Sequence, residues 1–267
     1  MSRTLTGRRT AAALFTAALL VPLATACGSD DDKGGENDAG TKGGGQKVKL
    51  TVLAAASLTD VFKTAGTAYE EEHHGTKVTF SFAGSQELAA QVRQGAPADA
   101  LVTADTTTME GLRGDTGTPT VIARNRLVIA VGEGNPHKIG GLKDLADDKL
   151  KVVLAAPEVP VGRYSKQVLD AQKVDVKPVS QEPNVRAVLS KVELGEADAG
   201  LVYATDAGSA TDKVDPVTIP DAQNAIASYP AAALKQSRHA DAAAAFVTWL
   251  SGPEAQKILR DAGFQKP

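Results

Sequence analysis

Cysteine, histidine and aromatic residues are scarce in this chain of 267 residues. It holds one cysteine and four histidines, and aromatic residues make up 4% of the sequence. A single cysteine cannot form an internal disulfide, and no C-x-x-C pair is present to bind zinc or carry out redox chemistry. Few residues are therefore available for a metal site, and we expect neither a resident metal nor a cofactor.

An excess of basic residues is also absent. The chain has 29 lysines and arginines against 32 acidic residues, a formal net charge of −3, which argues against nucleic acid as the main partner. With 42% hydrophobic and 23% charged residues, the composition excludes wholesale disorder and a multi-span membrane protein. The length suits one large domain or two modest lobes, each with its own core.

Residues 1–26 have the pattern of an export signal. They contain three arginines and no acidic residue, and the apolar run Ala11–Leu23 is followed by small residues. This run is interrupted by Pro22 and is too short for a membrane span of about 20 apolar residues. A basic head, a short apolar body and small residues before a break predict a secretory signal peptide. The pair Arg8-Arg9 leaves the twin-arginine export route open as an alternative to the general one.

Cys27 stands where the small residues Ala24-Thr25-Ala26 end. This position resembles the lipid-attachment site of secreted lipoproteins, which implies cleavage before Cys27 and a lipid anchor in the cell membrane. The rest of 27–46 contains nothing that can bury apolar surface, so a flexible linker is expected there. The folded part then begins near Lys47 and lies outside the cytoplasm.

From Lys49 onward, short apolar runs alternate with helical patterns. The expected strands are Lys49–Ala55, Lys77–Ala83, Ala100–Thr103, Arg124–Val131, Lys151–Ala155 and Ala199–Tyr203. The expected helices are Ser57–Tyr69, Gln86–Gln94, Tyr164–Ala171, Val185–Leu194, Ala240–Leu250 and Pro253–Asp261. Such alternation predicts an α/β fold with mostly parallel sheets flanked by helices. No repeat of 20–50 residues is present, which excludes a solenoid.

Four places in the chain share one local chemistry, in which a small or neutral polar residue separates a strand from a helix. They are Ala56-Ser57-Leu58, Gly84-Ser85-Gln86, Val161-Gly162-Arg163 and Asn184-Val185-Arg186. Free N–H groups at a helix start, aided by the helix dipole, bind anions. Taken singly, each serine also fits a capping role, and Ser57–Asp60 has the pattern of a capping box. The starts at Val161 and Val185 have no obvious side-chain cap, so the four starts together favour an anion site.

Tyr203 ends the strand AGLVY, and open α/β sheets bind ligands beyond the carboxyl ends of their strands. Its hydroxyl is therefore a candidate ligand contact, with packing in the core as an equal alternative. The sequence contains no G-x-S-x-G nucleophile elbow, phosphate-binding loop or G-x-G-x-x-G turn after a strand. Paired carboxylates or a serine–histidine set are also missing, so we expect a binding protein and not an enzyme.

Eight segments, taken in their order along the chain, resemble the molybdate-binding proteins of bacterial ABC-type importers. They are Ala54–Asp60, Ser81–Ala89, Gly95–Asp105, Arg124–Val131, Pro160–Leu169, Glu182–Leu189, Ala199–Ala207 and Gly252–Phe264. Each segment alone is weak evidence for the family, whereas the ordered set is specific to it. The resemblance covers nearly all of residues 48–267. The resemblance implies a two-lobe periplasmic-binding-protein fold of type II, with a tetrahedral oxyanion held in the cleft between the lobes.

Carried over position by position, the family's anion ligands fall on Ser57, Ser85, Val161, Val185 and Tyr203. The two serines would donate a hydroxyl and a backbone N–H, the two valines a backbone N–H, and the tyrosine its phenol. The family often has alanine where Val161 stands, and Gly84 replaces a frequent serine.

The resemblance also implies the boundaries of the lobes and the partners. Lobe 1 would comprise 47–123 plus 231–267, and lobe 2 would comprise 124–230. The ligand would be molybdate, with tungstate nearly matched in size and charge, and another tetrahedral oxyanion such as sulfate is the alternative. The expected protein partners are the membrane permease subunits of an ABC importer, and the binding protein itself is expected to be a monomer.

Overall fold

The computed structural model describes residues 47–267, which form one sheet of nine strands covered by helices. The strands are β1 Val48–Ala55, β2 Thr76–Ala83, β3 Ala100–Val102, β4 Thr120–Gly132, β5 Val152–Ala155, β6 Ser180–Glu182, β7 Ala199–Tyr203, β8 Val214–Thr218 and β9 Ile226–Ala233. The α-helices are α1 Thr59–Glu72, α2 Ser85–Arg93, α3 Thr106–Glu110, α4 Pro160–Gln172, α5 Val185–Glu193, α6 Ala204–Gly208, α7 Ala240–Trp249 and α8 Pro253–Asp261. Three 3-10 turns complete the set: η1 Ala56–Leu58, η2 Leu142–Ala146 and η3 Asp221–Gln223.

The sheet has two ends joined by two long strands. Its order is β2-β1-β3-β9-β4-β7-β5-β6, and β8 pairs with β4 outside this path. The pairs β1/β2, β1/β3, β5/β6 and β5/β7 are parallel, whereas every antiparallel pair involves β4 or β9. The α/β fold and the parallel strands at each end confirm the fold class predicted from the alternating pattern.

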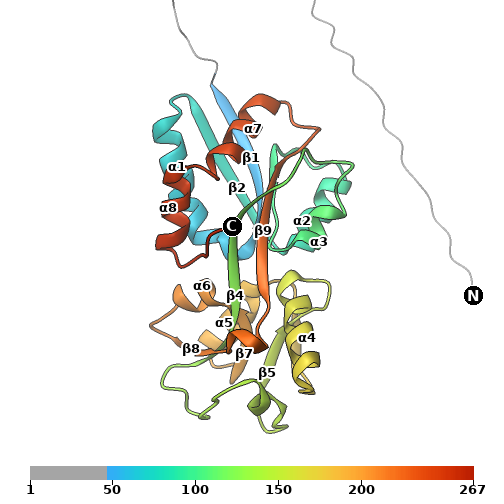
Figure 1. Ribbon diagram of the computed structural model, residues 1–267, viewed down its shortest axis with the longest axis vertical. Helices are drawn as coiled ribbons and strands as arrows, with labels where there is room; N and C mark the ends of the chain where they lie inside the picture. The colour runs from blue at the N-terminus through green and yellow to red at the C-terminus, as the bar shows by residue number, and fades with distance from the viewer. Residues whose placement is uncertain (1–46) are drawn as a thin grey trace, which may run out of the picture. The chain divides into compact units, whose positions relative to one another are not determined.

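We call the part built on β1–β3 lobe 1 and the part built on β5–β8 lobe 2. In lobe 1, α1 and α8 lie on one side of the sheet and α2 and α3 on the other, while α4, α5 and α6 surround the strands of lobe 2 (Figure 1). β4 (green) and β9 (orange) run side by side between the lobes (Figure 1). The first part of β4 pairs with β9 up to Arg126, and its second part pairs with β7 from Leu127.

The positions at which we expected the lobes to meet, 123/124 and 230/231, therefore lie inside β4 and β9 and not in loops. A hydrogen-bonded two-stranded ribbon joins the lobes, with a register shift between Val121 and Ala123. One cluster of buried apolar residues continues through this ribbon, from Leu50 in lobe 1 through Ile129 to Val153 in lobe 2. The connection between the lobes is thus packed as well as hydrogen-bonded.

Local sequence explains why each predicted element forms where it does. β1 buries Leu50, Val52 and Leu53 among β-branched and apolar neighbours, as expected for a central strand covered on both faces. α5 buries Val185, Val188, Leu189 and Val192, which recur at helical spacing on one face. The strand at Ala199–Tyr203 and the helix at Pro253–Asp261 have the predicted bounds.

Two predictions lie outside the residues that the structure describes: the signal peptide of 1–26, and the lipidated Cys27 with its linker to residue 46. Among residues 47–267, none of the helices combines the length and the apolar character of a membrane span.

Candidate binding site

The five residues predicted to bind an anion line one cavity between the lobes. Ser57 follows β1, Ser85 follows β2, Val161 follows β5 and Val185 follows β6, while Tyr203 ends β7. All five are buried, with at most 4% of their surface exposed. The cavity has a volume of about 10 Å³, close to the space that one water molecule needs. Its walls therefore nearly meet, and groups from both lobes lie within reach of one small ligand.

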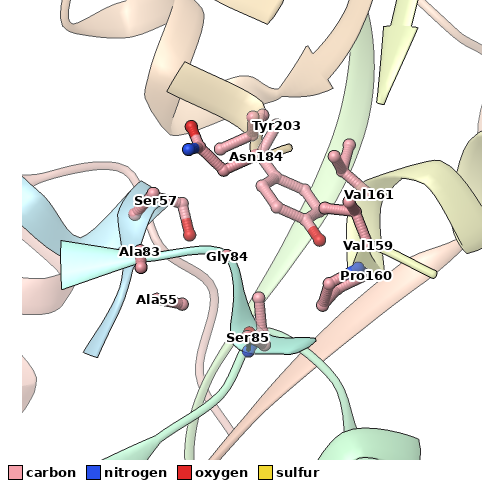
Figure 2. Close-up of a pocket in the computed structure, with 13 residues that line it drawn as sticks. Ala55, Ser57, Ala83, Gly84, Ser85, Val159, Pro160, Val161, Asn184 and Tyr203 are labelled. Atoms are coloured by element: carbon pink, nitrogen blue, oxygen red, sulfur yellow. Dashed lines mark hydrogen bonds between the residues drawn. The ribbon is translucent and has the colours of Figure 1, made fainter. Parts of the chain in front are cut away.

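Ser57, Gly84 and Ser85 of lobe 1 face Val161, Asn184 and Tyr203 of lobe 2 across this cavity (Figure 2). The loops that carry them follow the carboxyl ends of their strands, where α/β sheets bind ligands. No charged residue is among those that line the cavity. Any attraction for an anion thus comes from hydroxyls, amides and helix dipoles.

Ser57 does not cap a helix. α1 begins at Thr59 with Leu58 as its N-cap residue and without a side-chain cap, so the alternative of a capping box at Ser57–Asp60 is wrong. The Thr59 hydroxyl instead donates to the carbonyl of Ala56 at 2.7 Å. The Oγ of Ser57 lies 3.0 Å from the phenol oxygen of Tyr229, and it points toward the centre of the site (Figure 2).

Ser85 is the first residue of α2, and Gly84 is its N-cap. The Oγ of Ser85 accepts a hydrogen bond from the backbone N–H of Ala104 at 3.0 Å. Because that contact occupies a lone pair, the hydroxyl proton of Ser85 remains available to a ligand. A Cβ on Gly84 would stand 2.5 Å from the carbonyl oxygen of Pro183 in lobe 2. A serine at this position would therefore clash with the opposite lobe.

Val161 lies in the first turn of α4, directly after Pro160, and the N-cap of that helix provides no side-chain cap. The first helical hydrogen bond runs from the N–H of Arg163 to the carbonyl of Val159, so the N–H of Val161 precedes it and has no intrahelical partner. A Cβ on Gly162 would overlap the carbonyl oxygen of Ala156. The absence of a side chain thus lets this helix start pack directly against the end of β5.

Val185 is the first residue of α5, whose N-cap is Asn184. The Oδ1 of Asn184 accepts from the N–H of Ala187 at 3.0 Å, so our expectation that this start has no side-chain cap was wrong. The cap serves the third N–H of the helix, and the carbonyl of Asn184 accepts from Val188. Neither bond uses the N–H of Val185, which still precedes the intrahelical ladder.

Tyr203 has a hydroxyl that is buried and has no hydrogen-bond partner within residues 47–267. Its ring packs edge-on against Tyr229, with the ring centroids 5.9 Å apart, and its oxygen points into the cavity (Figure 2). Burial raises the pKa of Tyr203 well above its ordinary value of 10.0. The phenol therefore stays protonated at neutral pH and can donate.

Charged groups lie around the cavity and not in it. Arg163 of α4 pairs with Asp105 of lobe 1. Arg186 of α5 reaches Asp60 of lobe 1 and the fully buried Asp206 of lobe 2, both at 2.8 Å. Burial raises the pKa of Asp206 to about 6, and the nearby Arg186 guanidinium limits this rise. Each lobe 2 helix that points an N-terminus at the cavity thus also carries an arginine paired with lobe 1.

Several residues around the site were not predicted. Arg163 and Arg186 are the last residues of two of the predicted helix starts, so their position could have been noticed from the sequence. Asp105 caps α3 by accepting from the N–H of Thr108 at 3.0 Å, and its pairing with lobe 2 was not predicted. Tyr229 and Asn125 lie in the ribbon, where no local pattern marks them.

Comparison with known proteins shows the family of this chain. A family model for the bacterial extracellular solute-binding proteins matches residues 50–265. The chain belongs to this family. It is 39% identical over 256 residues to the molybdate-binding protein ModA of Mycobacterium tuberculosis, and the match covers 95% of this chain and 97% of ModA.

Two solved structures share the fold. The periplasmic molybdate-binding protein of Azotobacter vinelandii superposes with a TM-score of 0.69 at 23% identity, covering 82% of this chain and 99% of that one. The sulfate-binding protein SubI of Mycobacterium tuberculosis superposes with a TM-score of 0.74 at 21% identity, covering 82% and 87%. At these identities the likeness shows the fold alone, which is the two-lobe periplasmic-binding-protein fold expected from the sequence.

Proposed function

We propose that this protein captures molybdate outside the cytoplasm and delivers it to an ABC importer. The observation that carries the proposal is the Tyr203 hydroxyl, which is buried without a partner in the described part of the chain and points into a cavity bordered by hydroxyls and helix starts. A buried hydroxyl without a partner is costly, and a bound anion would satisfy it. The 39% identical relative is named a molybdate-binding protein.

Each of the five residues has a defined role in this proposal. Ser57 and Ser85 donate hydroxyls and backbone N–H groups, Val161 and Val185 donate backbone N–H groups, and Tyr203 donates its phenol. Each N–H lies at or near the start of a helix, where the dipole favours an anion. All five are neutral donors, so they suit an oxyanion whose oxygens only accept hydrogen bonds.

The five proposed hydrogen-bond donors distinguish between anions that carry a proton and anions that do not. Phosphate near neutral pH still carries a proton that needs an acceptor, whereas molybdate is fully deprotonated and accepts from every group. A site without an acceptor for that proton leaves two donors facing each other, which lowers affinity strongly. Sulfate carries no proton, so only its smaller size can disfavour its binding. Because the bonds in sulfate are shorter than those in molybdate, its hydrogen bonds would be stretched in a cavity shaped for molybdate. Tungstate matches molybdate and should bind equally well.

Calorimetric titrations with molybdate, tungstate, sulfate and phosphate test this function. We expect molybdate and tungstate to bind tightly, sulfate weakly and phosphate most weakly. The molybdate affinity should be nearly constant from about pH 7 to 9, because no ligand group titrates in that range. Phosphate that competes on equal terms would contradict the neutral-donor site, and tighter binding of sulfate than molybdate would favour the alternative of a sulfate-binding protein.

The anchor and the partners are further parts of the proposal. Cleavage before Cys27 and lipid attachment would hold the folded part at the outer face of the cell membrane, where the permease subunits of the importer receive the anion from a monomeric binding protein. Replacement Cys27→Ser should release mature protein or leave uncleaved precursor, with unchanged molybdate binding. Cys27→Ser protein that remains on the membrane with its signal removed would contradict lipidation.

A further inference from the structure

Arg186 contacts three different side chains, which belong to both lobes. Its Nε lies 2.8 Å from the Oδ1 of Asp206, and its Nη2 lies 2.8 Å from the Oδ2 of Asp60. Its Nη1 donates to the Oγ of Ser209 at 3.1 Å. Each nitrogen of the guanidinium thus contacts a different residue.

Two of these contacts stay within lobe 2. Asp206 belongs to α6, Ser209 is the C-cap residue of that helix, and α6 packs against the helix that carries Arg186. The Asp206 side chain is fully buried, and a buried carboxylate that loses its cation is strongly destabilising. The pair of Arg186 and Asp206 should therefore persist when the lobes separate. It holds the guanidinium in place on lobe 2.

Asp60 is the one of the three partners that lies in lobe 1. It stands in the first turn of α1, and its side chain is 54% exposed against 26% for Arg186. An exposed ion pair is weak in part because two long side chains must be ordered to form it. Here lobe 2 already orders the guanidinium, whose planar fork leaves Nη2 directed at Asp60. Little ordering of Arg186 is thus needed when the lobes close.

Each of the three charged residues lies within three positions of a proposed ligand residue. The neighbours along the chain are Val185 and Arg186, Tyr203 and Asp206, and Ser57 and Asp60. None of the three charged residues is among those that line the anion cavity. One guanidinium outside the cavity therefore connects the segments that carry three of the five proposed donors.

We propose that Arg186 is a positioning residue that brings three of the proposed donors together around the anion, and that Asp60 is the contact it gains when the lobes close. The inference rests on the proposed function, because it takes these donors to bind an oxyanion. The pair with Asp206 fixes the spacing of the two donors in lobe 2. The pair with Asp60 then brings Ser57 close to them and slows the release of the bound anion.

The substitution Asp60→Asn tests the lobe 1 half of this arrangement without changing the buried pair. Asparagine keeps the size of the side chain and removes its charge. Wild type and variant are loaded with radiolabelled molybdate and chased with an excess of unlabelled molybdate, which measures the rate of release. We expect release to be about threefold to fivefold faster and the affinity to be weaker by the same factor. Because salt screens an exposed pair, the difference should shrink at high ionic strength.

Asp60→Glu and Lys63→Gln are the matched controls. Glutamate restores the carboxylate and should recover most of the lost affinity, which a merely structural effect of the asparagine would not allow. Lys63 is another cation close to Asp60, at 3.9 Å, with a side chain that is 67% exposed. Lys63→Gln should release molybdate at the wild-type rate. The proposal is overturned if Asp60→Asn releases molybdate at the wild-type rate, or if either control loses as much affinity as Asp60→Asn.

A double-mutant cycle with Arg186→Lys tests whether Arg186 and Asp60 act as one unit. Lysine keeps a positive charge for Asp206, but its single ammonium group cannot contact both carboxylates as the fork does. Alone, Arg186→Lys should weaken molybdate binding at least as much as Asp60→Asn; in the Asp60→Asn background it should cause a smaller loss than it causes alone. Additive losses would overturn the proposal, and the Asp60 variants decide the question even where the lysine variant is unstable. Failure of the wild-type protein to bind molybdate would instead reject the proposed function itself.

Discussion

Arg163 and Asp105 form an ion pair that joins the two lobes beside the cavity. The Nε of Arg163 donates to the Oδ2 of Asp105 at 2.9 Å, and its Nη2 donates to the hydroxyl of Thr108 at 2.8 Å. The Asp105 side chain is 4% exposed. Arg163 lies two residues after Val161 on the same helix, so a single helix start both borders the cavity and contacts the opposite lobe.

Removal of this pair should weaken anion binding without touching a ligand group. In Arg163→Gln, closure of the lobes loses the attraction between a guanidinium and a largely buried carboxylate, which we place at roughly 1–2 kcal/mol for a partly exposed pair. Molybdate affinity measured by calorimetry should fall about tenfold. The matched control is Lys166→Gln, which breaks an exposed pair with Asp170 on the same helix and should have no effect; equal losses in both variants would contradict a role in closure.

Tyr203→Phe should separate binding from stability. The variant loses a charge-assisted hydrogen bond worth about 1.5–3 kcal/mol, so molybdate affinity should fall roughly tenfold to a hundredfold. The melting temperature measured without any oxyanion should stay constant or rise, because the variant no longer buries a hydroxyl without a partner. Ser57→Ala and Ser85→Ala should lose no more affinity than Tyr203→Phe, since both keep their backbone donors. Unchanged affinity in Tyr203→Phe would remove this residue from the site.

The role of a backbone N–H can be tested at Val185. Proline is favoured at the first position of a helix, where its missing N–H disrupts no intrahelical bond, and the extended Asn184 (φ −161°, ψ 169°) is compatible with a following proline. Val185→Pro should therefore fold but bind molybdate at least about tenfold more weakly. Val185→Ala and Val161→Ala keep the N–H and should bind nearly as well as the wild type. Equal affinity of the proline and alanine variants at position 185 would exclude this donor.

Asp206 should affect the pH dependence of stability in the direction opposite to most carboxylates. The pKa of folded Asp206 is raised from 3.8 to about 6 by burial. Between about pH 4 and 6 the folded protein thus keeps a proton that the unfolded chain has released, so the contribution of this group to stability falls as pH rises. The melting temperature of the wild type minus that of Asp206→Asn should therefore decrease from about pH 4 to about pH 7.

Glu70 provides the comparison of opposite sign. The Lys77 ammonium, which donates to this carboxylate, lowers the pKa of Glu70. The contribution of that group is present above its unfolded pKa and is lost as pH falls, so the wild type minus Glu70→Gln difference should increase with pH. A difference that stays constant with pH for Asp206→Asn would show that its carboxyl is not held protonated.

The site could be predicted from the sequence because it is built from helix starts. A strand, a small residue and a helix follow one another within a few positions, so Ser57, Ser85, Val161 and Val185 each have a local signal. That these four helix starts would meet at one cavity was harder to predict, because their meeting depends on the order of the strands in the sheet. Tyr203 could be proposed as the last residue of a strand, whereas its missing hydrogen-bond partner is visible only in three dimensions.

The ribbon and its side chains could not be predicted in the same way. β9 reads IASYPAAA, with small residues and a proline in place of the β-branched alternation that marks a strand, and it forms because β3 and β4 pair with it on both sides. The contact of Tyr229 with Ser57 spans 172 positions. The ion pairs of Arg163 and Arg186 likewise depend on how closely the lobes approach, which no local pattern encodes.

Burial of the five candidate ligand residues limits the rate at which an anion can bind. Under the proposed function, an anion would reach these residues only while the lobes stand apart, so each binding event would include an opening step that breaks the contacts of Arg163 and Arg186 with lobe 1. At high anion concentration the observed rate of association should therefore reach a plateau set by opening, independent of concentration. Release passes through the same step, so the permease, by drawing the lobes apart, would control when the anion leaves.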